Sequence, residues 1–98
     1  MKGVRFNRLA ERELQEAIVF YDEESPGLGD RFLDEVETGT AFILSHPEAS
    51  PRILGTIRRL VLPSFPYSLL YRPLPSGGIR ILAVAHQKRQ PDYWIGRR

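Results

Sequence analysis

The sequence predicts an α+β fold of order β-α-α-β-β-β, with an N-terminal helical hairpin packed on a small antiparallel sheet. In the first half, apolar residues recur every three or four positions, which is typical of amphipathic helices. After about residue 55 the apolar period changes to two, and prolines and glycines separate the runs, as between paired strands. A chain of 98 residues can bury roughly two-thirds of its unfolded surface. We therefore expect residues 1–98 to form one domain.

A first helix is expected over about residues 8–24, after a short strand at Val4–Phe6. Asn7 is a suitable N-cap, because its side-chain oxygen can accept from free N–H groups of the first helical turn. One face of this helix carries the apolar stripe Ala10, Leu14, Ala17, Ile18 and Tyr21.

A second helix is expected to begin at Ser25, with Pro26 at its first position, where a missing N–H costs nothing. It would end at His46 because the residue before Pro47 avoids the helical region. Gly39 lies inside the pattern, and the close approach of another backbone would explain it. The apolar stripe of this helix is Leu28, Phe32, Val36 and Ile43.

Three strands are expected after a loop at residues 47–55: Thr56–Leu62, Tyr67–Arg72 and Ile79–His86. The turn at residues 73–78 is rich in proline and glycine, so its flanking strands should pair as a hairpin. The last strand is the most apolar segment of the chain. We expect Ile79, Ile81, Ala83 and Ala85 to face the helices, and Arg80, Leu82, Val84 and His86 to line a groove on the opposite face.

Composition excludes several classes of protein. The hydrophobic fraction of 42% is too high for a disordered chain, and the absence of cysteine excludes disulfides and thiolate metal sites. There is no long apolar run and no signal-peptide pattern, so we expect a soluble, cytoplasmic protein. Charge is unevenly distributed: residues 1–48 have a net charge of −6 and residues 49–98 a net charge of +8. This asymmetry favours an acidic partner, unless the two halves neutralise each other within the fold.

The residue types leave metal-free RNA cleavage as the main catalytic hypothesis. The two histidines have no carboxylate cluster near them in sequence, so no metal or cofactor is expected. RNA cleavage needs a base, an acid and cations around the phosphate, and suitable residues are Arg59, His86, Arg89 and Tyr93. The alternative is that Tyr93 and Trp94 anchor the chain end on the sheet while the arginines remain solvated.

Five segments, in order along nearly the whole chain, resemble the RelE/ParE superfamily of type II toxin–antitoxin toxins, and within it the ParE-like branch. They are Ala10–Leu14, Tyr21–Phe32, Ile57–Arg59, Phe65–Tyr67 with Tyr71–Arg72, and Ile81–Trp94. The resemblance implies a toxin held inactive by a cognate antitoxin. ParE-like members poison DNA gyrase, whereas RelE-like members cut mRNA on the ribosome.

Two positions favour the gyrase branch over the nuclease branch. By the resemblance, the ribosome-dependent nucleases of the superfamily have basic residues at two positions where this chain has Ser68 and Gln87. Missing cations argue against efficient cleavage, because each typically stabilises the transition state by a few kcal/mol. The alternatives are an RelE-type mRNA interferase and a degenerate toxin that only binds its antitoxin.

The resemblance implies DNA gyrase and a ParD-like antitoxin as partners. A face with an apolar centre and cationic ends suits an amphipathic acidic segment, so the antitoxin is expected to bind through an acidic C-terminal segment. The residues expected to contact target or antitoxin are Arg58, Arg59, Tyr67, Tyr71, Arg80, His86, Arg89, Tyr93 and Trp94.

Overall fold

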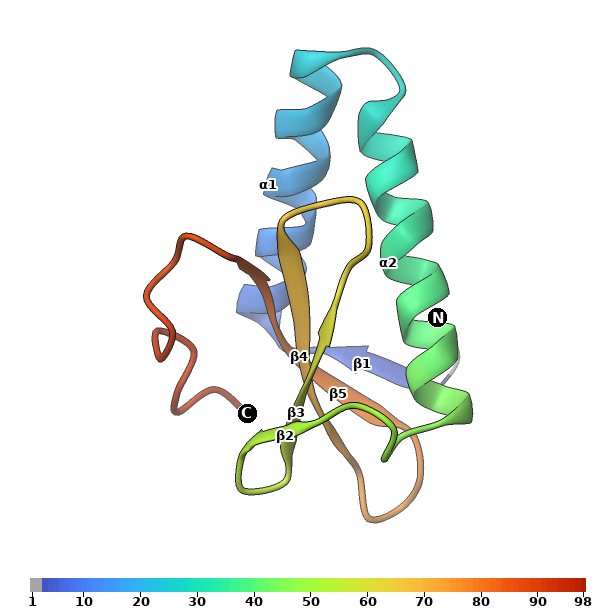
Figure 1. Cartoon of the computed structure of the whole chain (residues 1–98), viewed down its shortest axis with the longest axis vertical. Helices are drawn as coiled ribbons and strands as arrows, with labels where there is room; N and C mark the ends of the chain where they lie inside the picture. The colour runs from blue at the N-terminus through green and yellow to red at the C-terminus, as the bar shows by residue number, and fades with distance from the viewer. Residues whose placement is uncertain (1–2) are drawn as a thin grey trace.

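The computed structural model describes residues 3–98 as a helical hairpin on one face of a five-stranded mixed sheet (Figure 1). The α+β class is confirmed, with one strand more than expected. The helices are α1 (Arg8–Glu24) and α2 (Leu28–Ser45). The strands are β1 (Val4–Phe6), β2 (Arg52–Leu54), β3 (Ile57–Val61), β4 (Tyr67–Pro73) and β5 (Ile79–His86).

The sheet has the order β1-β5-β4-β3-β2. Strands β2 to β5 pair antiparallel in sequence, whereas β1 pairs parallel with β5, with Val4 opposite Ile79. The expectation of a wholly antiparallel sheet was therefore wrong at β1. Strand β2 was also missed because it lies within the stretch that we expected to be a loop, and all three of its residues are exposed.

The ends of the helices follow their capping chemistry. Asn7 caps α1 as expected, since its Oδ1 accepts from the N–H of Leu9 at 2.7 Å and of Ala10 at 3.4 Å. The expected start of α2 was wrong. Ser25 is the C-cap of α1, and α2 begins after Gly27, whose φ of 88° suits glycine.

Two glycines let α2 pack closely against its neighbours. A Cβ on Gly29 would overlap the carbonyl oxygen of Ile18 and lie 2.7 Å from Cγ of Asp22. At Gly39 the neighbours are side chains, with Cδ2 of Leu60 and Cδ1 of Leu69 both 3.1 Å away. The expected close backbone approach therefore occurs at Gly29 and not at Gly39.

This difference predicts unequal effects of alanine at the two positions. We expect Gly29→Ala to lower the free energy of unfolding by about 3 kcal/mol, because the α1 backbone cannot move aside cheaply. Gly39→Ala should stay within about 1 kcal/mol of wild type, since gained helix propensity offsets a tight contact with flexible leucines. Urea denaturation measures both, and equal effects would contradict this packing.

A β-bulge on β5 reverses the face on which the later residues lie. Leu70 pairs with Ala83 and Tyr71 pairs with Ile81, so Leu82 is an extra residue between them. Ile79, Ile81 and Val84 pack in the helix-side core, whereas Ala83 and Ala85 lie on the opposite face. The expectation that the alanines face the helices was wrong, because a strict period of two fails at a bulge.

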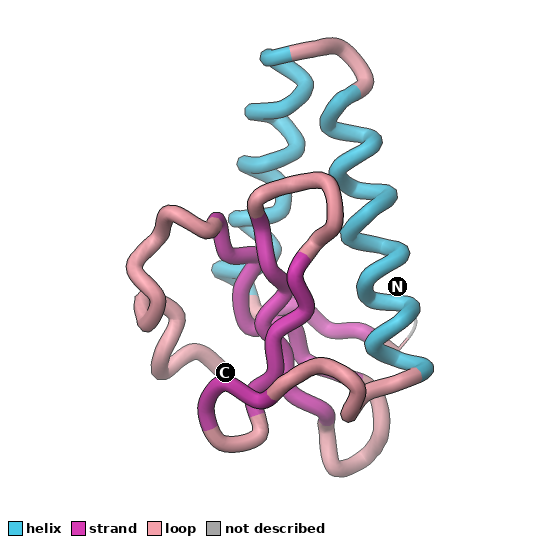
Figure 2. The backbone as a smooth tube through the Cα atoms, in the orientation of Figure 1, coloured by secondary structure: helices cyan, strands magenta, loops and turns pink. Residues whose placement is uncertain are grey.

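Two apolar clusters lie on opposite faces of the sheet. The larger joins both helices to the sheet through residues such as Leu14, Phe32 and Leu69. The smaller consists of Leu70, Ala83 and Trp94, with Ile57, Ala85 and Tyr93 packed against it. Its cover comes from residues 87–98, here called the tail, which has no helix or strand (Figure 2).

Candidate functional site

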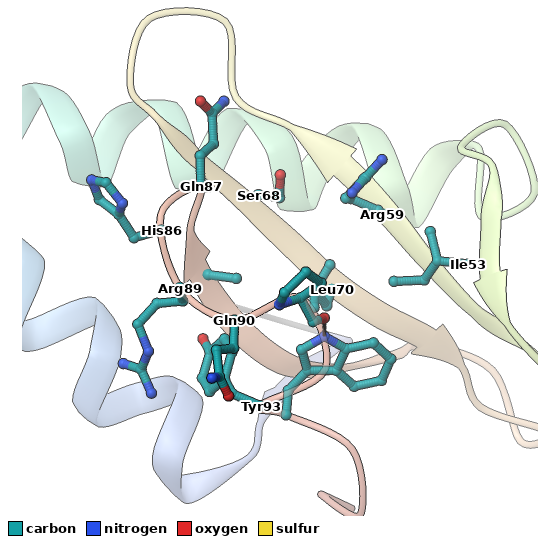
Figure 3. A pocket seen from close by; sticks show the side chains of 12 residues that line it. Ile53, Arg59, Ser68, Leu70, His86, Gln87, Arg89, Gln90 and Tyr93 are labelled. Atoms are coloured by element: carbon teal, nitrogen blue, oxygen red, sulfur yellow. Dashed lines mark hydrogen bonds between the residues drawn. The ribbon is translucent and has the colours of Figure 1, made fainter.

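A pocket of about 180 Å³ lies between the tail and the strand face that carries the smaller cluster (Figure 3). Its base is apolar and its rim is polar or cationic. We call it the tail pocket. It is lined by Ile53, Arg59, Ser68, Leu70, Ala85, His86, Gln87, Arg89, Gln90, Pro91, Tyr93 and Trp94.

The four residues predicted for RNA cleavage all line the tail pocket: Arg59, His86, Arg89 and Tyr93. Arg59 comes from β3 and Arg89 from the tail, and the two lie at opposite sides of the pocket in Figure 3. Both arginines are exposed. The fold thus brings together side chains separated by up to thirty-four positions in the sequence.

Three of these four side chains already have partners within the chain: the Arg89 guanidinium stacks on the Tyr93 ring, and Tyr93 and His86 form hydrogen bonds. The Tyr93 hydroxyl donates to Oε2 of Glu13 at 2.7 Å. Burial raises the pKa of Tyr93 above its ordinary value, and the bond to Glu13 raises it further, while Arg97 and Arg89 partly oppose this. Nδ1 of His86 accepts from the N–H of Lys88 at 3.0 Å, and the ring packs edge-on against Tyr67. The Tyr93 proton is therefore held away from any bound substrate.

Ser68 and Gln87 also line the tail pocket, where the resemblance placed nuclease cations. Both labels lie between His86 and Arg59 in Figure 3. The pocket lining therefore has uncharged polar groups where the resemblance placed cations, and both of its arginines are exposed. Such an arrangement can bind an anion, but it provides few charges to stabilise a phosphorane-like transition state.

A second groove, of about 340 Å³, lies between α1 and the adjoining ends of β4 and β5. Tyr67, also predicted for binding, lines this groove and packs against Phe32 and Tyr21. His86 and Arg89 line both the groove and the tail pocket. These two residues therefore lie where the two concave surfaces meet.

The other predicted contact residues have mainly structural roles. Tyr71 is fully buried and its hydroxyl donates to the Pro47 carbonyl, so it cannot present a surface to a partner. Trp94 is 5% exposed and packs beneath the pocket on Leu70 and Ala83. The expectation that Tyr71 contacts a partner was wrong, because an aromatic residue next to an arginine looks the same in sequence whether it is buried or exposed.

The remaining two arginines are bonded to backbone carbonyls. Arg58 donates through Nη1 to Glu48 at 3.0 Å and to Ser50 at 2.7 Å, which ties the loop after α2 to β3. Arg80 donates through Nε and Nη2 to the carbonyl oxygen of Arg98, at 3.3 and 3.1 Å. Neither lines the tail pocket.

Glu13 was not predicted from the sequence, although it is central to the tail. Its carboxylate accepts from Tyr93, from Arg97 and from the N–H of Val84. The Glu13–Arg97 ion pair, at 2.8 Å, leaves each side chain only 12% exposed. An acidic residue on a predicted helix gives no signal of a partner 84 positions away.

Metal-ligand clusters and membrane-spanning helices are both absent from the described residues. Within residues 3–98, no group of three or more histidine, aspartate or glutamate side chains could hold a metal ion. No helix in that part of the chain is long and apolar enough to cross a membrane.

The fold is shared with a chain of a TA system of known structure. The structure is similar to a chain of the chromosomal ParDE TA system from P. aeruginosa, with a TM-score of 0.70 and 18% sequence identity. That match covers 85% of this chain and 92% of the other, and at this identity it shows the fold alone. The search of curated proteins found no match.

The particular family follows from the sequence. A family model described as the ParE toxin of the type II toxin–antitoxin system parDE matches residues 4–91. The chain belongs to this ParE toxin family, so it is the toxin component of a type II toxin–antitoxin system, and its partner is an antitoxin.

Proposed function

We propose that this toxin binds and inhibits DNA gyrase in the cytoplasm, and that a ParD-like antitoxin neutralises it. The observation that carries the proposal is the chemistry of the tail pocket. Exposed Arg59 and Arg89 line the pocket together with the uncharged Ser68 and Gln87. This supports recognition of an anionic group without cleavage of a phosphodiester bond.

The positions of the hydrogen bonds also favour binding over catalysis. A general acid must be within hydrogen-bond reach of the leaving oxygen and able to release its proton. The Tyr93 hydroxyl instead donates to Glu13, and its pKa is raised. The groups that line the pocket therefore suit binding, and the Tyr93 proton is already committed to Glu13.

The proposed antitoxin contact follows from charge. Residues 49–98 have a net charge of +8, and the two arginines of the tail pocket lie at its rim. An acidic segment of the antitoxin would pair with them while its apolar side chains cover the groove beside α1. Binding of this kind would block the surface that we assign to gyrase.

A gyrase supercoiling assay tests the target. Purified toxin at micromolar concentration should inhibit supercoiling or trap cleaved DNA, and addition of the antitoxin should restore activity. Normal supercoiling together with a block of translation would overturn the proposal. Normal growth on overexpression without antitoxin would indicate a toxin that has lost its activity.

Ribosome-dependent mRNA cleavage is the second candidate, because Arg59, His86, Arg89 and Tyr93 all line one pocket. Primer extension on message from cells that express the toxin would show cuts in the A-site codon if this were the activity. Uncut message, with inhibited gyrase, would eliminate it.

A further inference from the structure

We infer that Glu13 is a positioning residue: through Tyr93 it holds Arg89 at the rim shared by the tail pocket and the groove. This inference rests on the proposed function insofar as Arg89 binds the anionic partner. Glu13 itself is only 12% exposed and belongs to α1, and it lines the groove but not the tail pocket.

One carboxylate joins three parts of the chain that are distant in sequence. Oε1 of Glu13 accepts from the Val84 N–H on β5 at 3.0 Å and from Nη1 of Arg97 at 2.8 Å. Oε2 accepts from the Tyr93 hydroxyl at 2.7 Å and from Nη2 of Arg97 at 3.2 Å. These four bonds, two on each oxygen, occupy the acceptor sites of the carboxylate and fix its orientation.

The Glu13 carboxylate lies beside the part of the β5 edge that β1 does not cover. Strand β1 ends at Phe6, which is opposite Ile81, so the edge of β5 has no neighbouring strand beyond that point. There Arg97 donates to the Leu82 carbonyl at 3.1 Å, and Glu13 accepts from Val84. The Glu13–Arg97 pair thus replaces a strand at this edge and brings the tail to it.

Tyr93 contacts both Glu13 and Arg89, and so links the carboxylate to the arginine. The Cζ atom of Arg89 lies 3.9 Å from the centroid of the Tyr93 ring, and Cζ of Arg97 lies 4.9 Å from it. Stacking of a guanidinium on an aromatic face orients an otherwise flexible side chain. Because the hydroxyl of the same ring is held by Glu13, the Tyr93 side chain cannot swing to another position without breaking that bond. Arg89 is exposed and lines both surfaces, so its orientation matters for binding.

Trp94 provides a separate measurement of whether the tail is docked on the sheet, independent of the effect of Glu13 on Arg89. It is the single tryptophan of the chain, and it packs on Leu70 and Ala83 without contacting Glu13 in the hydrogen-bond network. Its fluorescence therefore reports whether the tail is docked. We expect Glu13→Gln to leave the tryptophan emission unchanged, since the apolar anchor is intact.

The direct test observes Arg89 by NMR. In the wild-type toxin the Nε–Hε signal of Arg89 should be shifted by the ring current of Tyr93. Glu13→Gln should move this signal toward the value of a free arginine, whereas Glu11→Gln, an exposed glutamate of the same helix, should not. Tyr93→Phe keeps the ring and removes the hydroxyl, so it should move the signal in the same direction. An unmoved Arg89 signal in both Glu13→Gln and Tyr93→Phe would overturn the inference.

The functional test is a double-mutant cycle in the gyrase supercoiling assay. Glu13→Gln and Arg89→Ala should each raise the inhibitory concentration by about five- to tenfold, and the double variant should equal Arg89→Ala alone, because Glu13 acts through Arg89. Additive effects would overturn the inference. If wild-type toxin does not inhibit gyrase, the proposed function fails, and the NMR measurement still decides the role of Glu13.

Discussion

Replacement of Arg59 and Arg89 together by glutamate is expected to lower the affinity of the toxin for an acidic antitoxin segment by about 10²- to 10³-fold, since a reversed charge at an interface replaces attraction with repulsion. Both side chains are exposed and line the tail pocket from opposite sides. The double variant should fold normally, because neither arginine forms an ion pair in the described part of the chain. Isothermal titration calorimetry with the antitoxin measures the change.

The matched control reverses the same amount of charge elsewhere. Arg5 on β1 and Arg52 on β2 are exposed and lie outside the tail pocket. Arg5→Glu with Arg52→Glu should cost less than tenfold in affinity, and the remaining effect should shrink as salt is added. Equal losses in the two double variants would mean that antitoxin binding depends on net charge and not on the pocket.

Local signals in the sequence were sufficient to predict the helices and most of the sheet. The limits of α1, its Asn7 cap and the limits of β5 were all predicted correctly, because capping chemistry and apolar period act within a few residues. The start of α2 was not, since Ser25 has the composition of an N-cap but serves as the C-cap of α1. Composition alone does not distinguish these roles.

The errors in the sheet come from interactions between distant segments. The bulge at Leu82 depends on how β5 pairs with β4, and no single-strand pattern shows it. As a result the alanines face the tail. The alternative that Trp94 anchors the chain end on the sheet agrees with the structure, but its contact with Leu70 and Ala83 was not predicted. The exposed strand β2 lacks the alternation that identifies a half-buried strand.

The members of the candidate site could be predicted from residue type, but the interactions that hold them could not. Arg59, His86, Arg89 and Tyr93 were chosen by residue type, and the fold brings them to one pocket. What residue type could not show is how they are held. Glu13 and Arg97 lie 84 positions apart, and only the folded chain shows that they pair.

Replacement of Trp94 by alanine should release the tail and lower the free energy of unfolding by about 3 kcal/mol, the usual cost of removing a large aromatic residue from a packed cluster. Trp94 is 5% exposed and covers Leu70 and Ala83. The larger, helix-side cluster does not include Trp94, so helices and sheet should remain folded. Unfolding in urea, followed by far-UV circular dichroism, measures the loss.

Limited proteolysis distinguishes release of the tail from a general loss of structure. Lys88 and Arg89 are trypsin sites at the start of the tail, and cleavage there should accelerate in Trp94→Ala while cleavage within α1 and α2 does not. Ile95→Ala is the control, because Ile95 is 55% exposed and its truncation should change stability by less than about 0.5 kcal/mol. Equal proteolysis of the two variants would contradict the role of Trp94 as anchor. Since the tail forms one wall of the tail pocket, its release should also abolish whatever inhibition the wild-type toxin shows in the gyrase assay.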